Sequence, residues 1–301
     1  MSALTVLGGS RAEHIAVGLA KLLKAELGEV EVTKFPDGET YIRLLPDVKG
    51  RRVVYVNTLQ PSPNDALTET FLTLDALKDL GAREVHAIIP YMAYARQDER
   101  FRPGEAISIA TVAKLFKSLE LDSIYTVDMH LHRVTDPSRL FGARFRNLTG
   151  VLELAKYVKH RSELRENAIV IGPDEEAEQW ARIMAEDLNL DYAVLEKKRY
   201  SATEVRIEAR GADVGGKKAI IVDDIISTGG TIIEAAKVLR ELGASGVIVT
   251  CVHPVLSGNA YAKLQKLDLL DLAGTDAVLS PISHIPIAPA IAEALKNELS
   301  L

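Results

Sequence analysis

The sequence is poor in cysteine, with Cys251 alone among 301 residues. One cysteine cannot form a disulfide within the chain, and it lies in the apolar run 247–252. We therefore expect a buried structural thiol and a reducing compartment. No apolar run approaches the length of a membrane span, and the first residues lack the basic-then-apolar pattern of a signal peptide. These absences predict a cytoplasmic protein that does not enter a membrane.

An excess of basic residues is also missing. Lysine and arginine number 36 against 42 aspartates and glutamates, which gives a net charge of −6 and argues against general binding of nucleic acid or membrane surfaces. Two nucleotide motifs are absent, the Gly-x-x-x-x-Gly-Lys-Ser/Thr loop and a Gly-x-Gly-x-x-Gly turn after a strand. Their absence disfavours P-loop kinases and Rossmann dehydrogenases.

Apolar stretches of strand length alternate with amphipathic stretches of helical spacing. This order is typical of parallel sheets covered by helices. The predicted strands are 53–56, 85–89, 124–127, 169–171, 219–222 and 247–252. Between the first two, apolar residues recur at helical spacing and predict one buried helix face. Its members are Leu67, Phe71, Leu74, Leu77 and Leu80.

One segment recurs in the two halves of the chain, as ALKDLGA at 76–82 and VLRELGA at 238–244. Each copy is followed by an apolar strand that ends at a proline, Pro90 or Pro254. The match predicts internal duplication of an α/β domain. Chance similarity is the alternative, because glycine commonly follows a helix. We expect two domains, 1–147 and 148–301, each a mostly parallel sheet flanked by helices.

The stretch 219–231 predicts a site for a sugar phosphate. An apolar strand ends in two carboxylates and runs into a helix start rich in glycine and hydroxyls. A helix N-terminus offers free N–H groups to a phosphate, and glycines let the backbone approach it. Carboxylates accept hydrogen bonds from sugar hydroxyls, directly or through a hydrated cation; an ordinary helix cap is the alternative. The candidate ligands are Asp223, Asp224, Ser227, Thr228, Gly229, Gly230 and Thr231.

A second polar segment, 94–100, follows the predicted strand 85–89. Loops at the carboxyl ends of parallel strands commonly bind ligands. Arg96 offers a planar fork for phosphate oxygens, and Gln97 can both donate and accept toward a purine edge. The alternative is a solvated charged loop.

Three further segments are weak when taken singly. Phe35 precedes a Pro-Asp-Gly turn, where it can stack on a base or simply plug the local core. His130 follows the strand 124–127 and can ligate a metal or only form hydrogen bonds. The basic run 197–199 lies between two short apolar pieces that predict a hairpin; alone, it indicates a solvated sheet edge.

Together these motifs closely resemble the ribose-phosphate pyrophosphokinase family. The resemblance spans nearly the whole chain, whereas 219–231 alone is shared with type I phosphoribosyltransferases. The segments that carry it are Phe-x-Asp-Gly-Glu at 35–39, Arg-Gln-Asp at 96–98, Asp-x-His at 128–130, Pro-Asp at 173–174, Lys-Lys-Arg at 197–199 and the stretch 223–231. It implies two phosphoribosyltransferase-like domains, with ATP bound by the first and ribose 5-phosphate by the second.

The resemblance also implies a reaction. The β,γ-diphosphoryl group of ATP moves to the anomeric hydroxyl of ribose 5-phosphate, AMP is left, and Mg²⁺ is the cofactor. It further implies a homo-oligomer, at least a dimer, in which a neighbouring subunit completes the adenine site. The implied ATP ligands are Phe35, Asp37, Glu39, Arg96, Gln97 and Asp98; the implied metal ligands are His130 and Asp174; the implied catalytic cations are Lys197 and Arg199.

The chain departs from the family pattern at two places. Ser227 stands where many members carry aspartate, and Glu175–Glu176 follows Asp174 in place of a small, glycine-rich turn. Two other functions remain as alternatives. A type I phosphoribosyltransferase shares 223–231 but has no need for the segments of the first half. An inert regulatory subunit keeps the fold and loses the catalytic cations, which this chain retains.

Overall fold

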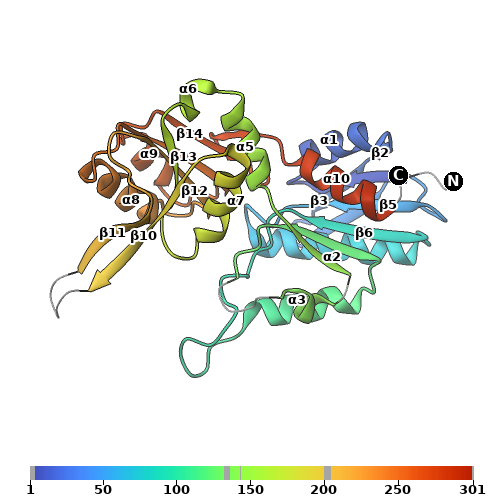
Figure 1. The fold of residues 1–301 in the computed structure, drawn as a ribbon. Helices are drawn as coiled ribbons and strands as arrows, with labels where there is room; N and C mark the ends of the chain where they lie inside the picture. The colour runs from blue at the N-terminus through green and yellow to red at the C-terminus, as the bar shows by residue number, and fades with distance from the viewer. Residues whose placement is uncertain (1–3, 132–135, 143, 200–204, 300–301) are drawn as a thin grey trace. The chain divides into compact units, whose positions relative to one another are not determined.

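The computed structural model describes the chain except for residues 1–3, 132–135, 143, 200–204 and 300–301. The chain forms two compact units, Met1–Thr149 with Ile287–Leu301, and Gly150–Pro286. Both have the α/β architecture expected from the alternation of apolar strands and amphipathic helices (Figure 1). Among the described helices, none has the length and hydropathy needed to cross a membrane.

The first unit is built on a six-stranded sheet in which every neighbouring pair is parallel, in the order β2-β1-β5-β6-β7-β8. Helices α1 and α10 lie on one face of this sheet and α2 and α3 on the other (Figure 1). The strands are β1 (Leu4–Gly8), β2 (Glu26–Gly28), β5 (Arg52–Val56), β6 (Glu84–Ile89), β7 (Ser123–Val127) and β8 (Phe145–Leu148). The helices are α1 (Glu13–Leu23), α2 (Pro63–Asp79), α3 (Ser108–Ser118), α4 (Ser138–Phe141) and α10 (Ala288–Leu299). A separate antiparallel hairpin pairs β3 (Val30–Lys34) with β4 (Thr40–Leu44).

The second unit has a seven-stranded sheet in the order β11-β10-β9-β12-β13-β14-β15. All pairs are parallel except β10 with β11, which form an antiparallel hairpin that extends away from the helices (Figure 1). The strands are β9 (Ala168–Gly172), β10 (Tyr192–Arg199), β11 (Val205–Gly211), β12 (Lys218–Ile225), β13 (Gly246–His253), β14 (Asp271–Thr275) and β15 (Ser283–Ile285). The helices are α5 (Val151–Lys159), α6 (Ser162–Arg165), α7 (Glu178–Leu188), α8 (Gly230–Glu241) and α9 (Ala260–Leu264).

All six predicted strands are present, as β5, β6, β7, β9, β12 and β13. Their near-continuous apolar sequences reflect burial on both faces, as is usual in parallel sheets. In the second unit, Ile221 and Val249 pack with Ile232 of α8 in one core cluster. Cys251 is also part of this cluster and is fully buried, which confirms the expected structural thiol.

The predicted buried face of α2 is wrong in part. Leu74 and Leu77 are fully buried, but Leu80 is 51% exposed, and Leu67 and Phe71 are only half-buried. Apart from Ala66, the remaining buried positions of the helix hold polar residues, namely Glu69, Thr70 and Thr73. They are tolerated because they are paired: the Glu69 carboxylate accepts hydrogen bonds from the backbone N–H and hydroxyl of Ser10 and from Arg11.

The assignment of residues 287–301 to the second domain is wrong. Helix α10 returns to the first unit and packs on α1, where an added Cβ on Gly18 would lie 3.0 Å from the Ala288 Cβ. Arg52 of β5 also donates a hydrogen bond to the Leu299 carbonyl at 3.2 Å. The helix therefore covers a sheet that is distant in sequence, which its amphipathic pattern could not reveal.

The two copies of the repeated segment are built alike. Gly81 and Gly243 have left-handed backbones, with φ of +81° and +85°, as is common directly after a helix. Each glycine carbonyl accepts a 2.8 Å hydrogen bond from the glycine that precedes the neighbouring strand, Gly50 or Gly216. The junctions are thus equivalent in geometry; duplication of the whole domain stays a prediction.

Candidate active site

The predicted sugar-phosphate residues form one surface at the end of β12. Asp223 and Asp224 are buried at the end of the strand, with 8% and 2% exposure. Gly229 follows with a left-handed φ of +77° and is the N-cap of α8. It has no side chain to accept hydrogen bonds from the first turn of the helix, so those N–H groups face outward beside the exposed Thr228 and Thr231. This arrangement suits an anion.

A segment that the sequence did not single out braces this loop. The Ile226 N–H donates to the His253 carbonyl at 3.1 Å, and the Ser257 N–H donates to the Ser227 carbonyl at 2.9 Å. The Leu256 N–H adds a third bond, to the Ile226 carbonyl at 2.9 Å. The loop is thus held against the residues that follow β13. The apolar run 247–252, which predicts the adjacent strand, is the only signal that pointed to them.

Electrostatics single out Asp223 within the loop. Burial raises the pKa of its carboxyl well above the usual range, and the charges of Asp224 and then Asp174 raise it further. Asp174, which lies 49 residues before Asp223 in the sequence, is thus electrostatically coupled to it, as is the adjacent Asp224. Cys251 occupies the position next to Asp223 on β13, and burial, followed by the charges of the two aspartates, raises the pKa of its thiol.

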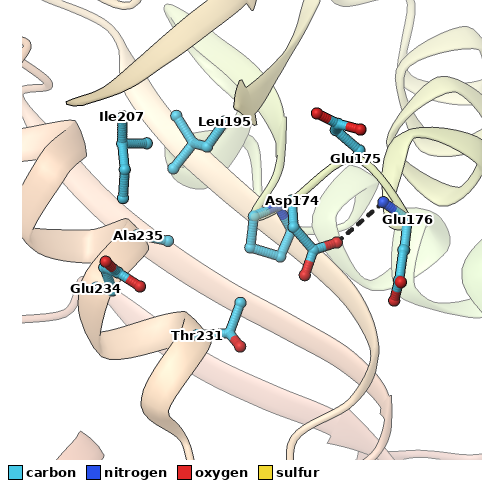
Figure 2. Close-up of a pocket in the computed structure, with 9 residues that line it drawn as sticks. Asp174, Glu175, Glu176, Leu195, Ile207, Thr231, Glu234 and Ala235 are labelled. Atoms are coloured by element: carbon cyan, nitrogen blue, oxygen red, sulfur yellow. Dashed lines mark hydrogen bonds between the residues drawn. The ribbon is translucent and has the colours of Figure 1, made fainter. Parts of the chain in front are cut away.

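A cavity of about 340 Å³ lies beside the loop, and Asp174 projects into it. Figure 2 shows the Asp174 carboxylate between Thr231 of α8 and the backbone of Glu176. Acidic side chains line part of the cavity, whereas Leu195 of β10 and Ile207 of β11 contribute apolar side chains. The lining residues are Pro173, Asp174, Glu175, Glu176, Leu195, Ile207, Thr231, Glu234 and Ala235. Glu234 is a cavity residue that the sequence motifs did not indicate.

The acidic side chains beside the loop provide only part of a coordination shell for a metal ion. In the described part of the chain, no group of three or more His, Cys, Asp and Glu side chains is arranged to hold one. The Asp174 Oδ1 accepts hydrogen bonds from the N–H groups of Glu176 and Ala177, both at 3.1 Å, which orients the carboxylate and leaves its second oxygen available. Mg²⁺ is usually held by one or two carboxylates together with substrate phosphates and water. Asp174 fits such a partial shell and not a preformed cage.

The predicted hairpin around 197–199 is present as β10 and β11. Lys197 is paired with Ile207 and Arg199 with Val205, so both cations lie on β10 itself and not between the strands. The side chains of Lys197 and Arg199 fall outside the described part of the structure. Their catalytic assignment stays a prediction.

The turn 35–39 joins β3 to β4. The Phe35 N–H donates to the Glu39 carbonyl at 2.9 Å, and the Asp37 Oδ1 accepts from the Glu39 N–H at 3.2 Å. Phe35 is 50% exposed and packs edge-to-face with Tyr41, with the ring centroids 5.7 Å apart. It is therefore not a core plug, and its ring is accessible to a ligand.

The loop after β6 carries the other implied ATP ligands. Arg96 is exposed, Gln97 is half-buried and Asp98 is buried. Tyr94 begins the loop with a left-handed φ of +68°, and its hydroxyl donates to the Asn64 side chain of α2.

The first turn of α2 anchors both of these elements. Lys34, at the end of β3, pairs with Asp65 at 2.7 Å, and Tyr94 bonds the adjacent Asn64. The structure thus joins the turn 35–39 and the loop 94–98 to one helix end. Neither of these two anchoring contacts includes a side chain that the family resemblance implies to bind ATP.

His130 lies just beyond the end of β7, at the same carboxyl edge of the sheet as the loop after β6. The strand is followed directly by a left-handed residue, Asp128, with φ of +35°. The Asp128 N–H donates to the Leu148 carbonyl at 2.8 Å, and the Met129 N–H donates to the Asn147 side chain at 3.0 Å. His130 and Asp174 belong to different units, and the role of each as a metal ligand stays a prediction.

Comparison with known proteins identifies the family. The model of the N-terminal domain of ribose phosphate pyrophosphokinase matches residues 4–119, and that of the phosphoribosyl transferase domain matches 147–270. A ribose-phosphate pyrophosphokinase of Methanopyrus kandleri is 41% identical over 98% of this chain and 99% of its own. Another, of Methanothermobacter thermautotrophicus, is 38% identical over 97% and 100%. The chain belongs to the ribose-phosphate pyrophosphokinase family.

A solved structure supports the same conclusion. The crystal structure of phosphoribosylpyrophosphate synthetase from Mycobacterium smegmatis matches with a TM-score of 0.86 at 29% identity, over 99% of each chain. The resemblance and the two-unit α/β fold expected from the sequence are thereby confirmed. Matches to both the N-terminal pyrophosphokinase domain and the phosphoribosyl transferase domain disfavour a type I phosphoribosyltransferase, which needs only the second.

Gly229 offers a direct test of the phosphate loop in this pyrophosphokinase family member. Gly229→Ala forces a side chain into a left-handed backbone, which costs about 1–2 kcal/mol, and places a Cβ 3.6 Å from Leu264. We expect the KM for ribose 5-phosphate to rise roughly tenfold as the first turn of α8 shifts, measured by initial rates, with a lower Tm in thermal denaturation.

The matched control is Gly216→Ala. Gly216 has a similar φ of +72° and, among the described atoms, none within 4 Å of an added Cβ, so we expect the same loss of stability with an unchanged KM. Equal KM values in the two variants would contradict the assignment of the loop.

Proposed function

We propose that the protein transfers the β,γ-diphosphoryl group of ATP to the anomeric hydroxyl of ribose 5-phosphate, giving 5-phosphoribosyl 1-diphosphate and AMP. The family membership supports the reaction. The observation that carries it is the surface at the end of β12, where an open helix N-terminus adjoins a buried carboxylate pair. Such a surface grips a phosphate and the hydroxyls of its sugar at once.

Ribose 5-phosphate is bound by the loop 227–231. Backbone N–H groups at the start of α8 and the hydroxyls of Thr228 and Thr231 take the phosphate, while Asp223 and Asp224 accept bonds from the ribose. Ser227 removes a charge relative to the aspartate of many relatives, which lowers the electrostatic repulsion beside a phosphate. Its backbone carbonyl accepts the Ser257 N–H, so the residue also helps to hold the shape of the loop.

ATP is bound by the first unit, with Arg96, Gln97 and Asp98 from the loop after β6. Phe35, Asp37 and Glu39 meet the adenine of a neighbouring subunit, which the exposure of Phe35 favours. The active protein is accordingly a homo-oligomer, at least a dimer, in the cytoplasm. Its substrates are two small phosphorylated molecules.

Mg²⁺ would be held by His130 in the first unit together with ATP, and a second Mg²⁺ by Asp174 in the second unit; when bound, the metal would neutralise charge on the transferring group. Phosphoryl transfer depends mostly on positioning and charge stabilisation. Lys197 and Arg199 of β10 supply positive charge, and the hairpin excludes water when it closes over the site. Asp223 and Asp224 orient the ribose hydroxyls for attack.

The test is to incubate the protein with Mg²⁺, ATP and ribose 5-phosphate and to identify the products by chromatography. Equal amounts of AMP and 5-phosphoribosyl 1-diphosphate are expected. ADP would mean an ordinary kinase. Binding of 5-phosphoribosyl 1-diphosphate without turnover would point to a phosphoribosyltransferase or an inert regulatory subunit.

A further inference from the structure

Glu105 organises the loop that carries the proposed ATP ligands. One oxygen of its carboxylate, Oε2, accepts hydrogen bonds from the N–H groups of Phe101 at 2.9 Å and Arg102 at 3.0 Å, and from Gln97 Nε2 at 3.2 Å. The Glu105 carbonyl accepts a further bond from Arg100 Nε at 2.9 Å. Four donors of the loop thus converge on one residue that no motif of the sequence singled out.

These bonds determine which end of the Gln97 amide remains for a ligand. Nε2 has two N–H groups; one donates to Glu105 and the other to the Glu99 carbonyl at 3.0 Å. Both partners can only accept hydrogen bonds, so the amide cannot be reversed without loss of both. The group left to face a ligand is therefore the carbonyl oxygen, Oε1, which is an acceptor.

The base of the loop is held as well. The Gln97 N–H donates to the Tyr94 carbonyl at 3.4 Å, and the Tyr94 hydroxyl bonds Asn64 on α2. Gln97 thus lies between an anchor on α2 and the Glu105 carboxylate. A group held in this way loses little conformational freedom when a ligand binds.

We infer that Glu105 is a positioning residue that presents Gln97 Oε1 to the nucleotide base and thereby selects a purine with an amino group at C6. Adenine offers such a donor, whereas guanine carries a carbonyl oxygen at the equivalent position. Two facing acceptors repel, so a guanine nucleotide leaves Oε1 unpaired. The inference rests on the proposed function, because it takes Gln97 to be an ATP ligand.

The experiment measures binding of ATP and of GTP, each with Mg²⁺ and without ribose 5-phosphate, by titration calorimetry. Glu105→Ala frees the amide, and we expect the ratio of ATP to GTP affinity to fall roughly 5- to 20-fold. Glu105→Gln keeps an acceptor for the three donors, so the ratio should stay within about threefold of the unaltered protein. Glu293→Gln removes the same charge from an exposed position of α10 and should change nothing.

A double-mutant cycle separates the orientation of the amide from general order in the loop. In a Gln97→Ala background, Glu105→Ala should no longer change the ratio. The inference is overturned if the unaltered protein binds ATP and GTP with equal affinity. It is also overturned if Glu105→Ala leaves the ratio of ATP to GTP affinity unchanged, or if Glu105→Gln lowers that ratio as much as Glu105→Ala does. Preference for ATP without formation of AMP would contradict the proposed function alone.

Discussion

Replacing Lys197 with alanine should lower kcat by about 10²- to 10³-fold, because a positioned cation that meets the transferring group stabilises charge chiefly in the transition state. The Kd for ribose 5-phosphate should change less than about threefold, since the proposed phosphate ligands lie on another element, at the start of α8. Steady-state rates and calorimetry with ribose 5-phosphate give the two quantities separately.

Lys198→Ala is the matched control for this variant. It removes the same charge from the next position of β10, and adjacent positions of a strand face opposite sides. We expect kcat to fall no more than about threefold in this variant. Similar losses at both positions would indicate a general electrostatic effect of the hairpin, and comparable losses of kcat and affinity in Lys197→Ala would contradict a role in the transition state.

Asp223→Asn should make the protein more stable and less active. The carboxylate is buried beside Asp224 and Asp174, so removing its charge relieves burial and repulsion together; we expect the free energy of unfolding to rise by about 1–3 kcal/mol at pH 7. The asparagine keeps the oxygen that accepts the Asp224 N–H at 3.0 Å. The kcat/KM for ribose 5-phosphate should fall roughly 10- to 100-fold, because an anionic acceptor for the sugar is lost.

The pH dependence of the stability gain identifies its cause. The pKa of Asp223 is higher in the folded protein than in the unfolded chain, so the folded state is penalised as pH rises from the ordinary carboxyl value through the raised pKa. The advantage of Asp223→Asn should therefore be absent near pH 3.5 and complete above the raised value. Denaturant unfolding without substrates or metal measures it, with Asp268→Asn, at an exposed carboxylate of the same unit, as the control. A less stable variant at pH 7 would contradict the repulsion.

Much of the fold was predictable, because the strands of a parallel sheet are buried on both faces and therefore have continuous apolar sequences. All six predicted strands occur. The errors share one cause. Helix α2 buries Glu69 because Ser10 and Arg11, 58 or more positions away, satisfy its carboxylate. Helix α10 belongs to the first unit because α1 and β5 bind it. Contacts between distant segments are not encoded in local periodicity.

The candidate site, like the fold, has features that the sequence predicted and features that it could not predict. Asp223 to Thr231 could be recognised because a helix start and the strand before it are contiguous in the sequence. The spacing of residues in such a segment largely determines how they are arranged in space. The brace at 253–257 and the role of Glu105 could not be recognised, because the first depends on the pairing of β12 with β13 and the second on a loop that folds back on itself. Neither leaves a pattern in the residues concerned.

By itself, the sequence determined the α/β class and the family and located the proposed sugar-phosphate loop, since each depends on residue types at short, regular spacings. Only the tertiary structure decided that Asp174, Asp223 and Asp224 share one electrostatic environment, that the last helix completes the first unit, and which end of the Gln97 amide is left for a ligand. The physical reason is that burial, charge coupling and hydrogen-bond satisfaction arise between side chains that meet only when the chain has folded.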